Sequence, residues 1–188
     1  MNLFLWGALP YIAFTFLIVG TLVRFFYFER NWTTKSSEFL EKKQLRIANP
    51  LFHFGLLCVI GGHVVGVLVP KTWTAAMGIN DHMYHEGALY MGAVAGIIFI
   101  VGFLLLMKRR FTVPAMKVNT SGFDKWLYLF LTLAIFSGMA GTLLNASGFF
   151  DYRVSIGPWF RSLLSFMPDP SLMEGVPFMF KFHMLAWM

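Results

Sequence analysis

The sequence is poor in cysteine and in charge. Its 188 residues include one cysteine, Cys58, and this residue lies inside an apolar run. A single cysteine excludes a disulfide framework and a thiolate metal site, so redox chemistry on this chain has to use histidine. Charged residues make up only 13% of the chain, whereas 57% are hydrophobic and 22 are phenylalanine. This composition excludes an ordinary soluble domain and indicates an integral membrane protein.

The few charges are unevenly placed. Lysine and arginine outnumber acidic residues by 15 to 9, which gives a net charge of +6. Most basic residues lie between apolar runs, so the positive-inside rule explains them and no nucleic-acid partner is expected. One connection holds Arg30, Lys35, Lys42, Lys43 and Arg46; another holds Lys108, Arg109, Arg110 and Lys117, with Lys125 just inside the span that follows. The others hold Lys71, and Arg153 with Arg161. The two richer connections are therefore expected in the cytoplasm, with the N-terminus outside.

Long apolar runs predict an all-α fold, a single transmembrane domain over residues 1–188 built as a five-helix bundle. About 20 apolar residues span a bilayer core as a helix. The expected spans are 3–28, which we expect to be kept as a span, 50–70, 87–107, 124–145 and 176–188. The last is cut off at Met188 and reaches only ~20 Å as a helix, too short to cross. It is expected to be a re-entrant segment or a truncated fifth helix.

Three features between and within the spans give local expectations. Aromatic residues near the ends of the first span are typical of membrane interfaces; they are Trp6, Tyr11, Tyr27 and Trp32. Ser36 or Ser37 is expected to cap a short amphipathic helix on the membrane surface. The long stretch from Ala146 to Gly175, rich in proline, glycine and aromatics, is expected to be functional or packed against a neighbour.

The second span carries two histidines, His53 and His63. Histidine inside a membrane helix is rare unless it faces a partner, so each one is a functional hypothesis. Their spacing places them ~15 Å apart along a helix and about 80° apart around it, so both can face one bundle interior. Four glycines in the same span are expected to leave room for something flat and bulky; they are Gly55, Gly61, Gly62 and Gly66.

A third histidine, His183, lies seven residues into the fifth segment, and His63 lies seven residues before Pro70. On antiparallel helices the two are expected at matching depth, as the axial ligands of one b-type haem require. His53 would bind a second haem, whose other ligand would lie beyond Met188. Two other interpretations stay open. The histidines could form only hydrogen bonds to backbone carbonyls, or they could form a proton relay. Zinc is disfavoured because it needs four close ligands.

A polar cluster marks the start of the third span. His82, Tyr84 and His85 lie there with Asp81 and Glu86. A quinol releases two protons with its two electrons, and histidine is a suitable hydrogen-bond partner and proton acceptor for that reaction. The cluster therefore predicts a quinol site, with a solvated interfacial turn as the alternative.

Several motifs together resemble the gamma subunit of respiratory nitrate reductase, closest to Gram-positive forms. They are LFHFGLLCVIGGHVVGVLVP, HMYH, KRRF with NTSGFD, FDYRVSIGPWFR and SLMEGVPFMFKFHM, which cover essentially the whole chain. The resemblance implies a five-span di-haem cytochrome b in the bacterial cell membrane. Such a subunit oxidises a quinol, expected to be menaquinol, near the outer face. Its electrons pass inward to an iron-sulfur beta subunit and a molybdenum alpha subunit that reduces nitrate.

By the same resemblance, His63 and His183 correspond to the ligands of the outer haem, and His53 to one ligand of the inner haem. Tyr84 stands where some relatives carry a lysine implicated in quinol binding, and His82 and His85 flank it. The alternatives are the cytochrome b anchor of another quinone-linked oxidoreductase, such as a hydrogenase or thiosulfate reductase, and a non-haem membrane anchor or transporter.

Overall fold

The computed structural model describes residues 2–28 and 38–188, and within them every regular element is a helix. In chain order the elements are η1 (Phe4–Ala8), α1 (Leu9–Tyr27), α2 (Lys43–Leu68), α3 (Lys71–Ala76), α4 (Asp81–Thr112), α5 (Pro114–Val118), α6 (Gly122–Leu144), α7 (Ile156–Leu164), η3 (Pro170–Met173) and α8 (Phe178–Trp187). The predicted all-α fold is confirmed. Among the described residues, four segments are long and apolar enough to cross a membrane: η1 with α1, α2, α4 and α6.

Two of these helices begin earlier than expected. α2 starts at Lys43 and runs through Pro50, which the sequence had suggested as its boundary. Pro50 lies inside α2 and cannot donate a hydrogen bond to the Arg46 carbonyl, yet the helix continues through it. α4 starts at Asp81, where the side chain of Asn80 accepts a hydrogen bond from the Met83 amide as an N-cap. Its 32 residues extend ~48 Å, well beyond a bilayer core.

The fifth apolar segment forms the ten-residue helix α8, which begins after Pro177 and packs against α6. Two glycines of α6 lie at this contact. A Cβ atom at Gly138 would lie within 3.5 Å of three atoms of the His183 ring, and one at Gly141 would lie 3.9 Å from Met179 and Phe180. The small residues thus let α8 approach the backbone of α6.

α2 and α4 pack closely along much of their length. A Cβ atom at Gly55 of α2 would collide with the backbone of Phe99, and one at Gly102 of α4 would collide with the backbone of Phe52. Phe99 and Phe103 of α4 form a buried cluster there with Ile135 of α6. The expectation that Gly55 leaves room for a bulky group is therefore wrong, because α4 occupies that space.

The connection between α6 and α8 covers one end of the bundle. Trp159 of α7 is 1% exposed, and its indole nitrogen donates a hydrogen bond to the carbonyl of Trp6 at 2.8 Å. Trp6 is itself buried against the Trp159 ring, and its expected depth at the membrane interface stays a prediction. The expectation that this stretch packs against a neighbour is confirmed. The expected surface helix near Ser36 and Ser37, and Trp32, lie outside the described residues.

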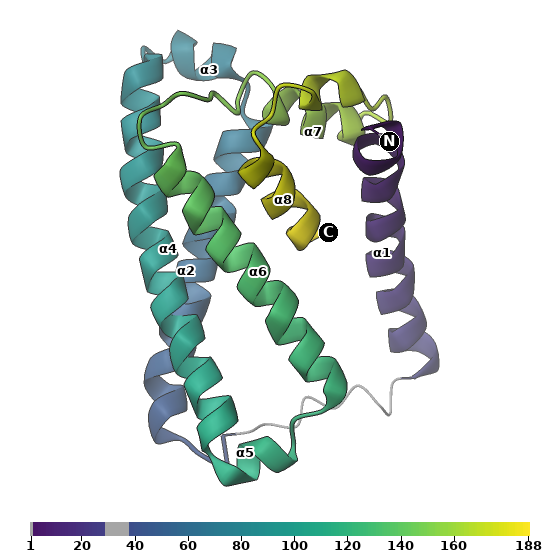
Figure 1. The fold of residues 1–188 in the computed structure, drawn as a ribbon, viewed down its shortest axis with the longest axis vertical. Helices are drawn as coiled ribbons and strands as arrows, with labels where there is room; N and C mark the ends of the chain where they lie inside the picture. The colour runs from purple at the N-terminus through teal and green to yellow at the C-terminus, as the bar shows by residue number, and fades with distance from the viewer. Residues whose placement is uncertain (1, 29–37) are drawn as a thin grey trace.

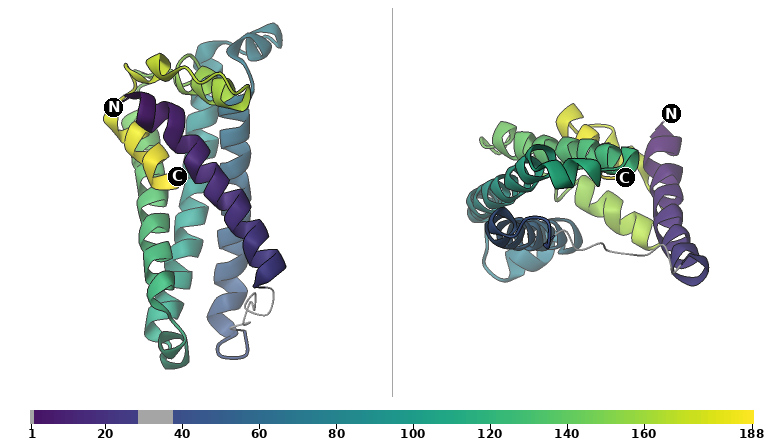
Figure 2. Two further views of the ribbon diagram at one scale, coloured as in Figure 1. Left: turned by 90° about the vertical axis from the view of Figure 1, so that its right-hand side faces the viewer. Right: turned by 90° about the horizontal axis from the view of Figure 1, so that it is seen from below.

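The connections gather at two opposite ends. Figure 1 shows α3, α7 and the N-terminus at one end, with α5 at the other. Figure 2 shows the same arrangement from two other directions, with α1 inclined across the long helices. The basic residues of 108–117 thus lie at the end opposite the N-terminus, as the sequence predicts. Which end faces the cytoplasm stays a prediction.

Candidate functional sites: a histidine pair and a polar cavity

The imidazole rings of His63 and His183 lie next to each other. Their centroids are 5.9 Å apart, with 41° between the ring planes. One ring comes from α2 and the other from α8, so the expected matching depth of these two residues is confirmed. Their role as ligands stays a prediction.

Hydrogen bonds fix the tautomers of both rings. The Nδ1 atom of His63 lies 2.7 Å from the carbonyl oxygen of Val59, and a carbonyl only accepts, so Nδ1 carries the proton. The Nδ1 atom of His183 lies 3.1 Å from the Ser137 hydroxyl, which donates its own proton to Ala134. Nδ1 of His183 is therefore the donor as well. Each ring keeps Nε2 unprotonated, which is the form that binds a metal.

The surroundings of the pair are asymmetric. The His183 ring lies over Gly138 of α6, whereas Gly61 and Gly62 of α2 have no described atom within 4 Å of a Cβ position. Gly66 faces Tyr152 instead. The room that the sequence suggested is thus present at Gly61 and Gly62, and absent at Gly55 and Gly66.

His53 has the same local arrangement as His63. Its Nδ1 atom lies 2.9 Å from the carbonyl oxygen of Asn49, so Nε2 is again left unprotonated. The ring packs edge-on against Phe52.

Within residues 2–28 and 38–188 there is no group of three or more histidine, cysteine or acidic side chains able to hold a bare metal ion. Two facing imidazoles suit an iron atom whose other ligands come from a macrocycle.

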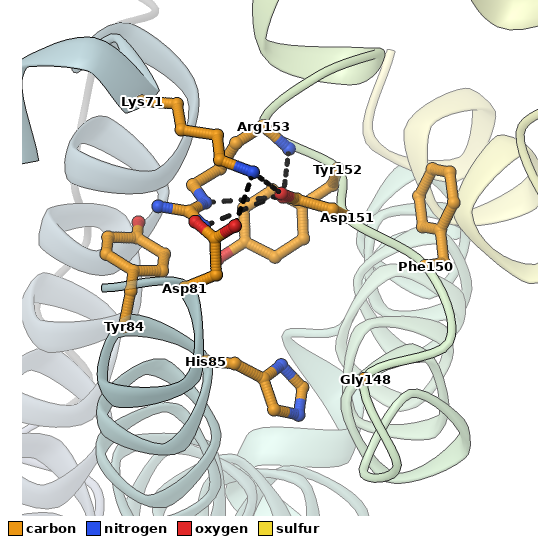
Figure 3. Close-up of a pocket in the computed structure, with 9 residues that line it drawn as sticks. All are labelled: Lys71, Asp81, Tyr84, His85, Gly148, Phe150, Asp151, Tyr152 and Arg153. Atoms are coloured by element: carbon orange, nitrogen blue, oxygen red, sulfur yellow. Dashed lines mark hydrogen bonds and ion pairs between the residues drawn. The ribbon is translucent and has the colours of Figure 1, made fainter. Parts of the chain in front are cut away.

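A polar cavity of about 290 Å³ lies at the end of the bundle near α3 and α7. It is lined by Lys71, Asp81, Tyr84, His85, Gly148, Phe150, Asp151, Tyr152 and Arg153. Figure 3 shows the charged side chains of this set converging from the start of α3, the start of α4 and the connection after α6, with Phe150 set apart from them. Tyr84 and His85, two residues of the predicted quinol site, both line this cavity.

Four charged residues form a closed ring at the cavity, hereafter the charge ring: Lys71, Asp81, Asp151 and Arg153. The Lys71 ammonium lies 2.7 Å from Asp81 and 3.1 Å from Asp151. The Arg153 guanidinium lies 3.0 Å from Asp81 and 3.2 Å from Asp151. Both carboxylates raise the pKa of Lys71. Burial raises the pKa of Asp151, but hydrogen bonds from Lys71 and Arg153 outweigh it and hold that pKa below its usual value.

Hydrogen bonds and stacking orient the other polar side chains of the cavity. The Nε2 atom of His85 donates to the carbonyl of Ala146 at 3.1 Å, so Nδ1 keeps a free lone pair. The guanidinium of Arg153 stacks on the Tyr84 ring, 3.8 Å from its centre. Burial and the neighbouring Tyr84 raise the pKa of Tyr152, so its hydroxyl stays protonated.

The sequence identified part of this cavity. His82 does not line it: its side chain is 79% exposed, and its Nε2 atom lies 3.5 Å from Glu86. Asp151 and Tyr152 were missed, and Lys71 and Arg153 were counted only as topology charges. The one available signal was the run DYR in the long connection.

Comparison with known proteins identifies the family. Residues 2–188 match the family described as nitrate reductase gamma subunit. The nitrate reductase gamma chain of Bacillus subtilis (strain 168) is 47% identical over 182 residues, 96% of this chain and 82% of that protein.

More distant relatives agree. The respiratory nitrate reductase 1 gamma chain of Escherichia coli (strain K12) is 27% identical, over the whole of this chain and 84% of its own length. The nitrate reductase-like protein NarX of Mycobacterium tuberculosis is 38% identical, over 96% of this chain and 28% of its own length. The chain belongs to the nitrate reductase gamma subunit family, the membrane cytochrome b subunits of respiratory nitrate reductase.

Proposed function

We propose that this subunit oxidises a quinol in the polar cavity and passes the electrons to a haem held between His63 and His183. The observation that carries the proposal is the facing pair of imidazoles. His63 and His183 would hold the haem iron through their Nε2 atoms. A metal–imidazole bond is about 2 Å long, so two rings that share one metal would have centroids about 6 Å apart, and the separation of 5.9 Å in the structure fits this.

The residues around the pair suit the same role. Protonated Nδ1 atoms on His63 and His183 would leave the Nε2 lone pairs available to hold the haem iron, as is usual for metal-bound histidine. The open faces of Gly61 and Gly62 leave space for a planar group beside α2. When bound, a b-type haem supplies a one-electron carrier within the membrane. His53, with the same tautomer, would supply one ligand of a second haem.

The chain's own cavity residues would manage the substrate. The free lone pair on Nδ1 of His85 is a suitable acceptor for a proton from the quinol hydroxyl. Oxidation removes two electrons and two protons, and leaves a neutral quinone. Menaquinol is the proposed donor. The proposed acceptors of the electrons are an iron-sulfur beta subunit and then a molybdenum alpha subunit.

The topology completes the proposal. With α5 in the cytoplasm and α3 and α7 outside, the quinol would be oxidised near the outer face, and α8 would be the start of the fifth span. Electrons would move inward while protons are released outside. Charge would therefore cross the membrane without a proton pump.

Histidine variants test the haem site. We expect His63→Ala and His183→Ala in the assembled enzyme to lose the spectrum of one b-type haem, and quinol oxidation with it. His82→Ala is the control, because that side chain is 79% exposed and lies outside the cavity. Unchanged haem spectra in both of the first two variants would refute the ligand assignment.

A different histidine variant tests the quinol site. His85→Gln should slow haem reduction by menadiol, a short quinol, while the haem content stays intact. His82→Gln should leave the rate unchanged. Loss of haem from the His85 variant would instead assign that residue a structural role.

A further inference from the structure

Tyr84 and Tyr152, which both line the cavity, bring their hydroxyls close to one glycine of α2. A Cβ atom at Gly66 of α2 would lie 3.1 Å from Cε2 of Tyr152, 3.5 Å from its hydroxyl and 3.6 Å from the Tyr84 hydroxyl. Both hydroxyls therefore meet α2 at the same place. Besides burial, Tyr84 also contributes to the raised pKa of the Tyr152 hydroxyl. We call Tyr84 and Tyr152 the tyrosine pair.

Both members of the pair are held in fixed positions. The carbonyl of Tyr152 accepts a hydrogen bond from the Gly157 amide at 2.9 Å, at the start of α7. α7 is in turn joined to the end of α2 by Arg161, whose guanidinium donates to the Val67 carbonyl at 2.7 Å. The Tyr84 ring is covered by the guanidinium of Arg153, whose side chain is only 4% exposed.

The pair lies close along the chain to the proposed haem ligand. Gly66 follows His63 by three residues, which is ~4.5 Å along the axis of an α-helix. Gly66, which both tyrosine hydroxyls approach, is thus about one helical turn from His63. The charge ring lines the same cavity. A substrate whose oxygen reaches the pair would lie close to this part of α2.

We propose that the hydroxyls of Tyr84 and Tyr152 bind one oxygen of the quinol in the cavity, and that Arg153 is the positioning residue for Tyr84. This inference rests on the proposed oxidation of a quinol in the cavity. The phenols donate or accept hydrogen bonds and undergo no net change. The two protons of the quinol leave by other groups, His85 first, and the two electrons pass to the haem.

A structural role is the alternative, in which the two hydroxyls only satisfy each other's hydrogen bonds. The two roles differ in what the loss of a hydroxyl changes. A structural hydroxyl affects stability and leaves the KM for quinol alone, whereas a substrate-binding hydroxyl raises the KM and weakens quinone binding.

The experiment uses the assembled, haem-loaded enzyme in membranes. Tyr152→Phe and Tyr84→Phe should each raise the KM for menadiol about three- to tenfold, the effect of losing one hydrogen bond. Binding of menadione, followed by quenching of tryptophan fluorescence, should weaken by the same factor. The haem spectrum and nitrate reduction by reduced viologen, which bypasses quinol, should not change. Tyr90→Phe is the matched control, since Tyr90 is 67% exposed.

The positioning role has its own test. Arg153→Gln should raise the KM as Tyr84→Phe does, and combining the two should add little, because both act through one hydroxyl. Arg153→Lys should recover part of the loss. If either tyrosine variant loses its haem spectrum, Gly66→Ala replaces it, because the new methyl group would displace the Tyr152 ring and raise the KM.

Normal KM and normal menadione binding in Tyr152→Phe and Tyr84→Phe, with His85→Gln still slow, would overturn the role of the pair and leave the quinol site standing. Normal quinol kinetics in His85→Gln as well would overturn the proposed quinol site itself.

Discussion

The ring of His183 lies against Gly138, where a Cβ atom would stand only 2.8 Å from its Cε1 atom. Real Cβ contacts are longer than this, so the absence of a side chain at Gly138 determines where the ring lies. α6 thus contributes to the histidine pair without supplying a ligand.

Gly138→Ala should therefore displace His183. We expect the outer haem to be lost or its absorption band to shift, while the haem assigned to His53 is retained. Gly92→Ala is the control, because no described atom lies within 4 Å of its Cβ position. The measurement is the reduced-minus-oxidised spectrum of each purified complex. Two normal haem bands in Gly138→Ala would show that the ring has room to move.

Ser137→Ala should weaken the haem site without removing a ligand. The Ser137 hydroxyl accepts the Nδ1 proton of His183 at 3.1 Å, and loss of such a partner typically costs 10- to 100-fold in metal affinity or activity. Haem retained during purification, measured per mole of protein, should fall. Thr142→Ala is the control, because that hydroxyl bonds only within α6, to the Gly138 carbonyl. Equal retention in both variants would argue against a role for Ser137.

Trp159→Phe should loosen the contact between α7 and η1. The variant loses the 2.8 Å hydrogen bond to the Trp6 carbonyl and part of the edge-on ring contact. We expect a destabilisation of about 1–3 kcal/mol, seen as a lower thermal unfolding temperature in detergent. Trp73→Phe, at a position 62% exposed, should change the unfolding temperature little. An unfolding temperature equal to wild type in Trp159→Phe would contradict this account.

The charge ring should stabilise the protein over a defined pH range. The pKa of Asp151 is held below its usual value, so its contribution is present above about pH 4 and is lost as pH falls through the lowered pKa. The pKa of Lys71 is raised, so its contribution is present below about pH 10 and is lost as pH rises through the raised pKa.

Asp151→Asn tests this pH dependence. Between about pH 5 and pH 9 the variant should unfold at a lower temperature than wild type by a constant margin, and below about pH 4 the margin should shrink. Thermal unfolding measured across this pH series gives the answer. Glu174→Gln, an exposed acid outside the ring, should show no such margin. A margin that persists undiminished to pH 3 would contradict the prediction.

Local patterns in the sequence were enough to identify the long apolar helices and the histidine pair. Length and hydropathy identify a span, and counting residues from Pro70 and from Val176 places His63 and His183 at one depth. Proline was the misleading signal: at Pro50 it costs one hydrogen bond near a helix end and does not stop the helix.

Long-range partners were not accessible in the same way. In the local sequence only the neighbours of Trp6 along the chain can be considered, and these make it resemble an interfacial aromatic. Its partner in space, Trp159, lies 153 residues later in the chain. From the sequence, Lys71 and Arg153 can equally be basic residues that set the membrane topology or members of the charge ring. Only the fold brings them to the same two carboxylates. The tyrosine pair depends on the approach of α7 to the end of α2, which no local pattern predicts.

The charge ring consists of two cations and two anions, so its net charge is zero. A substrate that enters as a neutral quinol and leaves as a neutral quinone is therefore neither attracted nor retained by a net electrostatic field from these four residues. Its affinity for the cavity should vary little with ionic strength. The product can depart as readily as the reactant arrives, which suits a subunit that has to turn over many molecules from a membrane pool.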